Sequence, residues 1–129
     1  MGLLKRIRIR ERSIGDSAED RAARYLRRRK HQILERNFNC RFGEIDLITR
    51  DRGGHLVFVE VRYRTDSSFA SAMESVTPAK QDKLRKAARI YLSKHPKLSE
   101  LPCRFDVIAL QRANDSGKIA IKWLRNAFY

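Results

Sequence analysis

Apolar and polar residues alternate along two neighbouring runs in the middle of the chain, at residues 45–48 and 56–61. Alternation with a period of two is typical of a β-strand that buries one face. The residues between the two runs include Asp51, Gly53 and Gly54, which favour a tight turn. The pattern therefore predicts a β-hairpin.

The alternation also assigns the side chains of this hairpin to two faces. One face of the second run carries Val57, Val59, Val61 and Tyr63, and the other carries Phe58, Glu60 and Arg62. In the first run, one face carries Ile45 and Leu47, and the other carries Glu44, Asp46 and Ile48. Each predicted strand therefore holds carboxylates among apolar neighbours.

Two other segments show the spacing of three and four residues that is typical of an amphipathic helix. The first spans residues 16–30, and its apolar stripe comprises Ala18, Ala22, Ala23 and Leu26. The second begins at Thr77 and Pro78, a capping residue followed by the proline favoured at the first helical position. Its stripe runs toward Pro96 and comprises Leu84, Ala87, Ala88, Tyr91 and Leu92.

Three further strands are expected at residues 33–38, 103–110 and 119–124, and the Ser-rich residues 65–76 are expected to form a loop. Asp106 lies in the second of these strands, where pairing with Arg104 or with a helix residue would satisfy its charge. The resulting order is one helix, three strands, one helix and two strands. It predicts an α/β (α+β) sandwich in which helices flank a mixed central sheet.

The composition indicates a small basic protein. The chain has 129 residues, the size of one domain, and we interpret residues 1–13 as a basic arm and residues 14–129 as that domain. Its formal net charge of +14 favours a polyanionic partner. Ribosomal and membrane-surface proteins can share this composition, so charge alone does not choose among these classes. No apolar run approaches the ~20 residues of a membrane span, and the two cysteines lack a zinc-finger spacing. We therefore expect a cytoplasmic protein without a membrane partner.

The carboxylates of the predicted hairpin are the clearest chemical signal in the sequence. An ionised carboxylate among apolar residues must be paired, hydrogen-bonded or bound to a metal, or else its pKa rises. Asp46 on one strand and Glu60 on the next, with Arg62 on the same face as Glu60, match a metal-dependent phosphodiesterase site. Hard oxygen ligands of this kind suit Mg²⁺ or Mn²⁺.

The residues around these carboxylates resemble a known family. The resemblance rests on RFGEIDLI at 41–48, FVEVRYR at 58–64, SVTPAKQ at 75–81 and RFDVIA at 104–109. Together these motifs resemble the YraN-like family of the restriction-endonuclease-like nucleases, whose D…E-x-K signature reads here Asp46, Glu60 and Arg62. The resemblance spans residues 15–129 and implies a nuclease-like domain, with the archaeal Holliday-junction resolvases as the nearest functional analogy.

The resemblance implies roles for particular residues. The implied metal ligands are Asp46, Glu60 and the backbone carbonyl of Val61, and the implied catalytic residues are Asp46, Glu60, Arg62, Glu19, Lys80 and Gln81. Arg62 stands where the superfamily usually has lysine, so it could bind phosphate but could not act as a general base. Two assignments have structural alternatives: Glu19 could complement the dipole of its own helix, and Lys80 and Gln81 could form an ordinary polar first turn.

Basic residues outside the carboxylate site are candidates for nucleic-acid contacts. They are Arg6, Arg8, Arg10, Arg27, Arg28, Arg29, Arg41, Arg64, Lys83 and Lys86. The expected function is that of a metal-dependent endonuclease, which hydrolyses phosphodiester bonds in branched or otherwise structured DNA. Two other classes stay open: a non-catalytic nucleic-acid-binding module on the same fold, and a basic RNA- or ribosome-associated protein. A second copy of the chain also stays open as a partner.

Overall fold

The computed structural model describes residues 18–64, 69–113 and 118–129, and these form a five-stranded sheet with helices on both sides. The strands, in chain order and in sheet order, are β1 (Gln32–Cys40), β2 (Gly43–Arg50), β3 (Leu56–Arg64), β4 (Cys103–Ala113) and β5 (Lys118–Phe128). β3 and β4 are parallel, and the other neighbouring pairs are antiparallel. The connection from β3 to β4 contains the helices α2 (Phe69–Glu74) and α3 (Pro78–Lys94) and the 3₁₀ turn η1 (Leu98–Glu100). Such a crossover is what a parallel pair requires.

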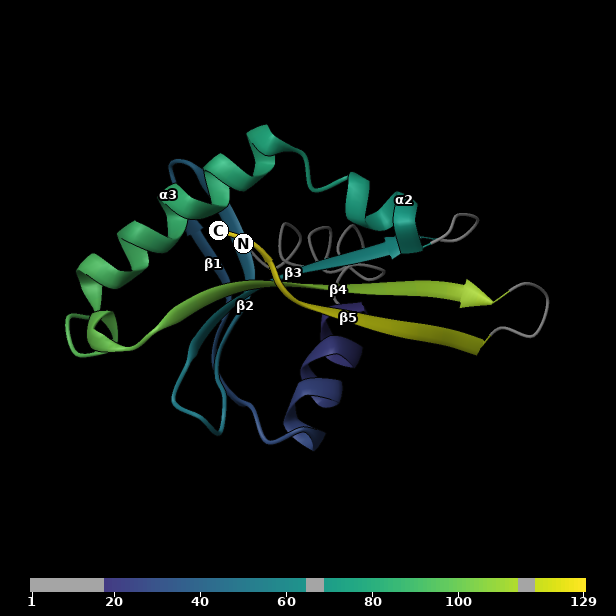
Figure 1. The fold of residues 1–129 in the computed structure, drawn as a ribbon, viewed down its shortest axis with the longest axis horizontal. Helices are drawn as coiled ribbons and strands as arrows, with labels where there is room; N and C mark the ends of the chain where they lie inside the picture. The colour runs from purple at the N-terminus through teal and green to yellow at the C-terminus, as the bar shows by residue number, and fades with distance from the viewer. Residues whose placement is uncertain (1–17, 65–68, 114–117) are drawn as a thin grey trace, which may run out of the picture.

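Helices cover the two faces of the sheet, so the protein has two cores. α2 and α3 lie on one side, and the first helix, described over residues 18–28, lies on the other (Figure 1). The core under α3 includes Leu84, Ala87, Tyr91, Ile48 and Phe58. The core under the first helix includes Ala22, Leu26, Leu47, Val57 and Val59. The predicted α+β sandwich with a mixed sheet is confirmed. The predicted arm at residues 1–13 lies outside the described residues.

The first helix ends two residues earlier than predicted, at residue 28. Lys30 adopts a left-handed conformation with φ 69°. The N–H of His31 donates to the Leu26 carbonyl at 3.0 Å, and the N–H of Lys30 donates to the Arg27 carbonyl at 3.0 Å. These two bonds form a Schellman-type C-terminal cap, which ends the helix and turns the buried His31 toward the sheet.

β2 and β3 are paired only near the turn of their hairpin, from Arg50 opposite Leu56 to Leu47 opposite Val59. Beyond that point both strands continue, and Figure 1 shows that they separate. Ile45 consequently packs in the core under α3 instead of sharing a face with Leu47. The prediction that these two residues share a face is therefore wrong, because β2 changes direction where its pairing with β3 ends.

A short helix occupies part of the segment that was predicted to be a loop. α2 spans Phe69–Glu74, so the loop prediction is wrong for these residues. Six residues are too few to show a helical period, and a helix of this length depends on tertiary packing. Ala72 supplies that packing because it is buried, and Met73 lies against the core under α3.

β1, β4 and β5 are longer than predicted, because their ends carry polar residues that alternation does not assign to a strand. Arg112 at the end of β4 pairs with Ile119, and β5 continues past the predicted end at residue 124 to Phe128. β1 likewise extends to Cys40, where it pairs with Gly43. Pairing with a neighbour, and not the side-chain pattern, sets these limits.

Thr77 caps α3 as predicted: its hydroxyl accepts a hydrogen bond from the Lys80 N–H at 3.2 Å, and Pro78 is the first helical residue. Thr77→Ala is expected to lower the free energy of unfolding by about 1 kcal/mol, because the Lys80 N–H loses its partner. Urea denaturation measures this difference, and Thr77→Ser, which keeps the hydroxyl, serves as the control. Equal stability of Thr77→Ala and the wild type would contradict the prediction.

Candidate metal centre

The candidate site lies where β2 and β3 separate. At this point the Val61 N–H of β3 has no backbone partner on β2, and instead it donates to Oδ2 of Asp46 at 2.8 Å. The carboxylate of Asp46 therefore continues the edge of the sheet after the backbone pairing has ended. This contact gives Asp46 a fixed position beside Val61, and both residues line a pocket of about 260 Å³.

Two more carboxylates converge on Asp46. Glu19, from the first helix, and Glu44, two residues before Asp46 on β2, each bring an oxygen into a group whose members lie within 4.8 Å of one another. Sequence reasoning did not select Glu44 as a site residue. The signal was present, because residues two apart on a strand share a face and alternation had placed Glu44 with Asp46.

The assembly of these carboxylates is unfavourable when no cation is present. Burial, and next the charge of Asp46, raise the pKa of Glu19 to about 7. Burial raises the pKa of Asp46 well above its usual range, with further contributions from the charge of Glu60 and from a hydrogen bond between these two side chains. Both carboxyl groups are thus shifted toward the protonated form, as expected for buried acids close together.

β1 contributes two polar residues to this site that the sequence had not indicated. Arg36 lies with a guanidinium nitrogen 3.7 Å from Glu19 and forms a 2.8 Å ion pair with Asp20. Asn37 adopts a left-handed conformation with φ 54°, and its hydrogen bond to Glu19 lowers the pKa of that group. Its neighbours pair with Leu47 and Ile45, which places Asn37 opposite Asp46. Asparagine tolerates this conformation better than most residues.

Glu60 lies beside Asp46 but faces two cations. It is 4% exposed, and its Oε2 lies 2.8 Å from an Arg62 guanidinium nitrogen and 3.6 Å from the Lys80 ammonium. Lys80 reaches the strand from the first turn of α3, so this helix terminus supplies a positive charge to the site. The structure therefore brings together the predicted residues Glu19, Asp46, Glu60, Arg62 and Lys80.

Gln81 is the predicted site residue that the structure does not bring into this group. Its amide nitrogen donates to the Val76 carbonyl at 3.0 Å, and its amide oxygen accepts a hydrogen bond from Arg85 at 3.4 Å. Among the described residues these are its polar partners, and they tie α3 to the preceding turn. A role for Gln81 in holding phosphate or water would require these bonds to break.

The carboxylate group fits a hard divalent cation. Glu19 Oε2 is buried and has no hydrogen-bond partner in the described part of the chain, so a ligand position is left for an ion. A cation there would also relieve the repulsion that raises the pKa values of Glu19 and Asp46. The oxygen-only donor set of Glu19, Glu44 and Asp46 suits Mg²⁺ or Mn²⁺.

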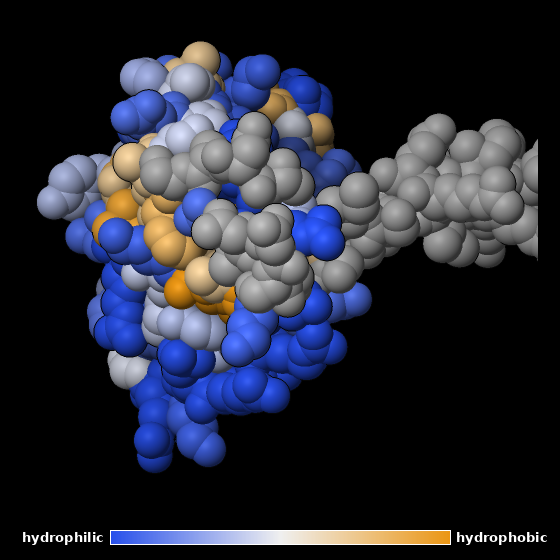
Figure 2. All heavy atoms as spheres, turned by 90° about the vertical axis from the view of Figure 1, so that its right-hand side faces the viewer, coloured by the Kyte–Doolittle hydropathy of each residue, from blue (hydrophilic) through white to orange (hydrophobic). Residues whose placement is uncertain are grey.

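The predicted nucleic-acid contacts are distributed over both sides of the sheet. Arg64 lines the same pocket as Asp46, while Arg27, Arg28 and Arg29 are exposed at the end of the first helix. Figure 2 views the end of the sheet where β3 finishes, and hydrophilic residues cover its lower half, on the side of the first helix. On the other side, Arg41 and Lys86 both lie over the ring of Phe42, and Lys83 is exposed on α3. Arg6, Arg8 and Arg10 lie outside the described residues.

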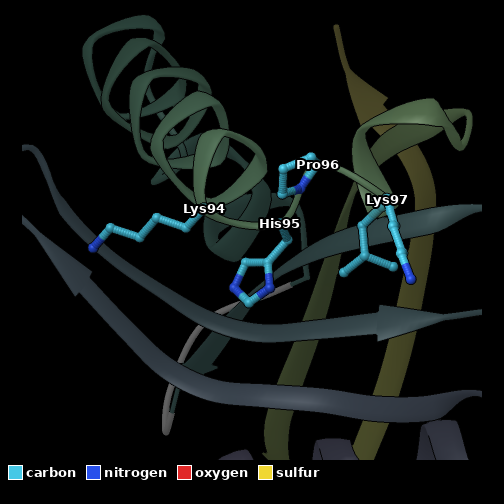
Figure 3. A pocket seen from close by; sticks show the side chains of 5 residues that line it. Lys94, His95, Pro96 and Lys97 are labelled. Carbon is cyan, nitrogen blue, oxygen red and sulfur yellow. The ribbon is translucent and has the colours of Figure 1, made fainter.

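A second, wider pocket has no carboxylate and is not a candidate for the metal. It has a volume of about 420 Å³ and lies where α3 ends, lined by Lys94, His95, Pro96, Lys97 and Leu98 (Figure 3). The His95 ring stacks on Tyr91 with 4.1 Å between ring centroids, which fixes its orientation.

No described helix is both long and apolar enough to cross a membrane.

Comparison with known proteins finds relatives that cover most of the chain. The model of an uncharacterised protein family, UPF0102, matches residues 18–110, a range that contains every residue of the carboxylate site. A UPF0102 protein of Nitrosococcus oceani is 46% identical over 114 residues, which cover 88% of this chain and 90% of the relative. A UPF0102 protein of Ralstonia nicotianae is 50% identical over 118 residues, covering 88% and 85%, and one of Hahella chejuensis is 47% identical over 115 residues, covering 89% of each.

Proposed function

Since the chain belongs to the UPF0102 family, whose name states no activity, we propose a function from the site itself: a metal-dependent endonuclease that hydrolyses phosphodiester bonds in branched or otherwise structured DNA. The observation that carries this proposal is the convergence of Glu19, Glu44 and Asp46 from the first helix and β2, with Glu60 of β3 beside Asp46. Such a group is unfavourable for stability, and a bound cation would offset that effect. The resemblance of the sequence to restriction-endonuclease-like nucleases supports the same proposal.

In this proposal Glu19, Glu44 and Asp46 hold the metal. A bound Mg²⁺ or Mn²⁺ would supply charge neutralisation at the phosphate and a water of lowered pKa. The hydrogen bond from the Val61 N–H keeps Asp46 oriented toward the pocket. Because this bond uses the backbone amide of β3 and not a side chain, any residue except proline at position 61 can make it.

The two cations beside Glu60 would act on the phosphate. Lys80 and Arg62 both lie at Glu60 Oε2, so they hold this carboxylate, and Arg62 also lines the pocket that contains Asp46. A guanidinium can donate two parallel hydrogen bonds to a phosphate, and an ammonium can donate to one oxygen. Hydrogen bonds aimed at a charge that develops during hydrolysis would lower the barrier of that step.

One observation favours the second candidate function, a nucleic-acid-binding module without catalysis. The 2.8 Å ion pair between Arg62 and Glu60 satisfies a carboxylate that the family resemblance assigns to the metal. If this pair persists when DNA is bound, Glu60 serves the structure and not the reaction. The third class, a basic RNA- or ribosome-associated protein, is supported by the +14 charge alone.

Cleavage of a panel of substrates tests the proposal. A four-way DNA junction, a linear duplex and a structured RNA are incubated at equal salt with Mg²⁺, with Mn²⁺ and with a chelator. We expect cleavage of the junction that depends on the metal and is lost in Glu60→Gln. The matched control is Glu100→Gln, which makes the same change at an exposed residue of η1. Binding of junction DNA without cleavage in either metal would favour the binding module, and preferential binding of the RNA would favour the third class.

Binding to DNA is expected to weaken steeply as salt rises, because the net charge of the protein is +14. Each DNA phosphate that a basic residue neutralises releases condensed counterions, and this release is less favourable at high salt. Replacing Arg27, Arg28 and Arg29 together by glutamine should lower the slope of log affinity against log salt by about 1 for each phosphate contact that is lost. Preference among sequences should not change. Fluorescence anisotropy of a labelled duplex measures both effects, and an affinity that does not vary with salt would contradict this expectation.

A further inference from the structure

Another pocket, lined mainly by polar residues, lies at the opposite end of the first helix from Glu19. Its volume is about 200 Å³, and four separate parts of the chain contribute residues to it. Arg29 and His31 follow the first helix, Arg52 lies in the turn between β2 and β3, and Trp123 and Arg125 lie on β5. We call this the arginine pocket and define it by Arg29, Arg52 and Arg125.

The arginine pocket has an excess of positive charge. Its wall also contains Arg104, but this guanidinium is neutralised by Asp51 at 2.7 Å and Asp106 at 3.0 Å. Arg29, Arg52 and Arg125 are exposed, and no carboxylate of the described residues forms an ion pair with any of them. Three guanidinium groups around one small polar cavity are a strong attraction for an anion.

Buried contacts hold the wall of the pocket in place. Asp106 is fully buried, and it accepts hydrogen bonds from Arg104, from the Trp123 indole N–H at 2.9 Å and from the Asn126 N–H at 2.9 Å. This network confirms the prediction that Asp106 pairs with Arg104. It also fixes Trp123, on whose ring the Arg125 guanidinium lies at 4.1 Å from the centroid.

Stacking orients two of the guanidinium groups and leaves N–H donors on each for a ligand, while the Nη1 of Arg29 donates to the Tyr25 carbonyl at 3.2 Å. Arg29 lies over the Tyr25 ring at 3.4 Å from the centroid, as Arg125 lies over Trp123. A guanidinium that stacks on an aromatic ring still presents its N–H donors in the ring plane, and this planar fork matches the oxygens of a phosphate. Arg29 and Arg125 are therefore oriented for contact with a tetrahedral oxyanion.

Along the axis of the first helix, basic residues lie between the carboxylate site and the arginine pocket. Arg21, Arg24 and Arg28 line a third pocket of about 200 Å³ on the exposed side of the first helix, between Glu19 and Arg29. At ~1.5 Å per helical residue, the ten residues from Glu19 to Arg29 span about 15 Å. A nucleic-acid strand that lies along this helix would therefore reach both sites.

We infer that the arginine pocket binds a phosphate group of the same strand that the carboxylate site holds, about 15 Å away along the first helix. The phosphate chemistry follows from the three guanidinium groups, whereas the identity of the strand rests on the proposed function. A strand bound in this way runs along the first helix and passes Arg21, Arg24 and Arg28. The pocket then sets the position of the strand relative to the carboxylates.

Trp123 lines the arginine pocket and is the only tryptophan of the chain, so tryptophan fluorescence reports directly on this pocket. Its emission is measured at low salt while inorganic phosphate, a short DNA strand with a 5′-phosphate or the same strand without it is added. We expect a saturable change with each ligand and competition between inorganic phosphate and DNA. A larger affinity for the 5′-phosphorylated strand would assign the pocket to a strand end, and equal affinity would assign it to an internal phosphate.

The pocket variant is Arg29→Gln combined with Arg52→Gln and Arg125→Gln, all at exposed positions. We expect it to lose the response of Trp123 and to bind DNA about tenfold more weakly at low salt. The matched control removes three exposed charges on the other side of the sheet, with Arg89→Gln and Lys94→Gln on α3 and Lys97→Gln just after it; Figure 3 shows Lys94 and Lys97. It should keep the response, and circular dichroism should show that both variants are folded.

Two results would separate this inference from the proposed function. If labelled DNA binds but Trp123 emission stays constant, and the pocket variant binds as tightly as the wild type, the pocket is overturned and the proposed function stands. If inorganic phosphate changes the emission but DNA does not bind even at low salt, the phosphate pocket stands. In that case the assignment of the strand falls together with the proposed function.

Discussion

Asp46→Asn is expected to stabilise the metal-free protein at pH 8 while it abolishes metal binding and reduces DNA cleavage by at least about 100-fold. Burial and the charge of Glu60 raise the pKa of Asp46, so its charged form is unfavourable in the folded state. Asparagine removes the charge and keeps an oxygen that can accept the Val61 N–H. We expect an increase on the order of 2 kcal/mol in the free energy of unfolding, since one unit of pKa shift corresponds to about 1.4 kcal/mol.

The same shifts determine how stability depends on pH. Asp46 and Glu19 have raised pKa values when folded, that of Glu19 rising from 4.5 to about 7, so the folded protein binds more protons than the unfolded chain within this window. Stability therefore falls as pH rises through the window. The protonated carboxyls contribute their full stability below the unfolded pKa, and this contribution is lost as pH rises through the folded pKa. Mg²⁺ should restore stability at the upper end of the window, because it binds the deprotonated carboxylates.

Thermal unfolding at pH 5 and pH 8, with a chelator and with Mg²⁺, measures these effects. The wild type should be less stable at pH 8 than at pH 5 in the chelator, and Asp46→Asn should reduce this difference. Asp82→Asn, on the exposed face of α3, is the matched control and should leave the difference unchanged. Two results together would show that the carboxylates do not repel one another. The wild type would be equally stable at both pH values, and Asp46→Asn would be less stable than the wild type at pH 8.

The strand pattern predicted where the carboxylates lie, but not how they are combined. Alternation placed Asp46 and Glu60 among apolar neighbours, and the structure puts them side by side. Alternation could not predict that β2 and β3 separate beyond Leu47, because the end of pairing depends on how two strands meet. That separation is what frees the Val61 N–H for Asp46, and it also accounts for the misplaced face of Ile45.

The features that the sequence could not reveal are those made by residues far apart in the chain. Thr77 and Pro78 predicted the start of α3 correctly, because capping depends on neighbouring residues. The arginine pocket, by contrast, combines Arg29, Arg52 and Arg125 from three separate segments, and only the fold brings them together. Local patterns therefore predicted the helices and strands, whereas the arrangement of the strands in the sheet brings the residues of both sites together.

Arg62→Lys is expected to raise metal-dependent cleavage by about tenfold or more, and Arg62→Ala is expected to abolish it. Arg62 donates to Glu60 at 2.8 Å, and its Nε is buried without a hydrogen-bond partner among the described residues. A guanidinium can only donate hydrogen bonds, because it stays protonated in proteins. The pKa of a lysine ammonium falls more readily when it is buried near other cations, so lysine could orient or deprotonate the attacking water.

Single-turnover cleavage of a labelled DNA junction compares the wild type, Arg62→Lys and Arg62→Ala at matched binding. Both arginine and lysine supply a positive charge next to Glu60, so DNA binding should be retained in Arg62→Lys and weakened in Arg62→Ala. Lys80 lies 3.6 Å from the same Glu60 oxygen, and Lys80→Gln controls for the loss of one charge at this site without a change at position 62. If Arg62→Lys binds DNA normally but is as inactive as Glu60→Gln, the side chain at position 62 does not limit the reaction. The Arg62–Glu60 ion pair would then be a structural contact, and the non-catalytic binding module would be the better description of this protein.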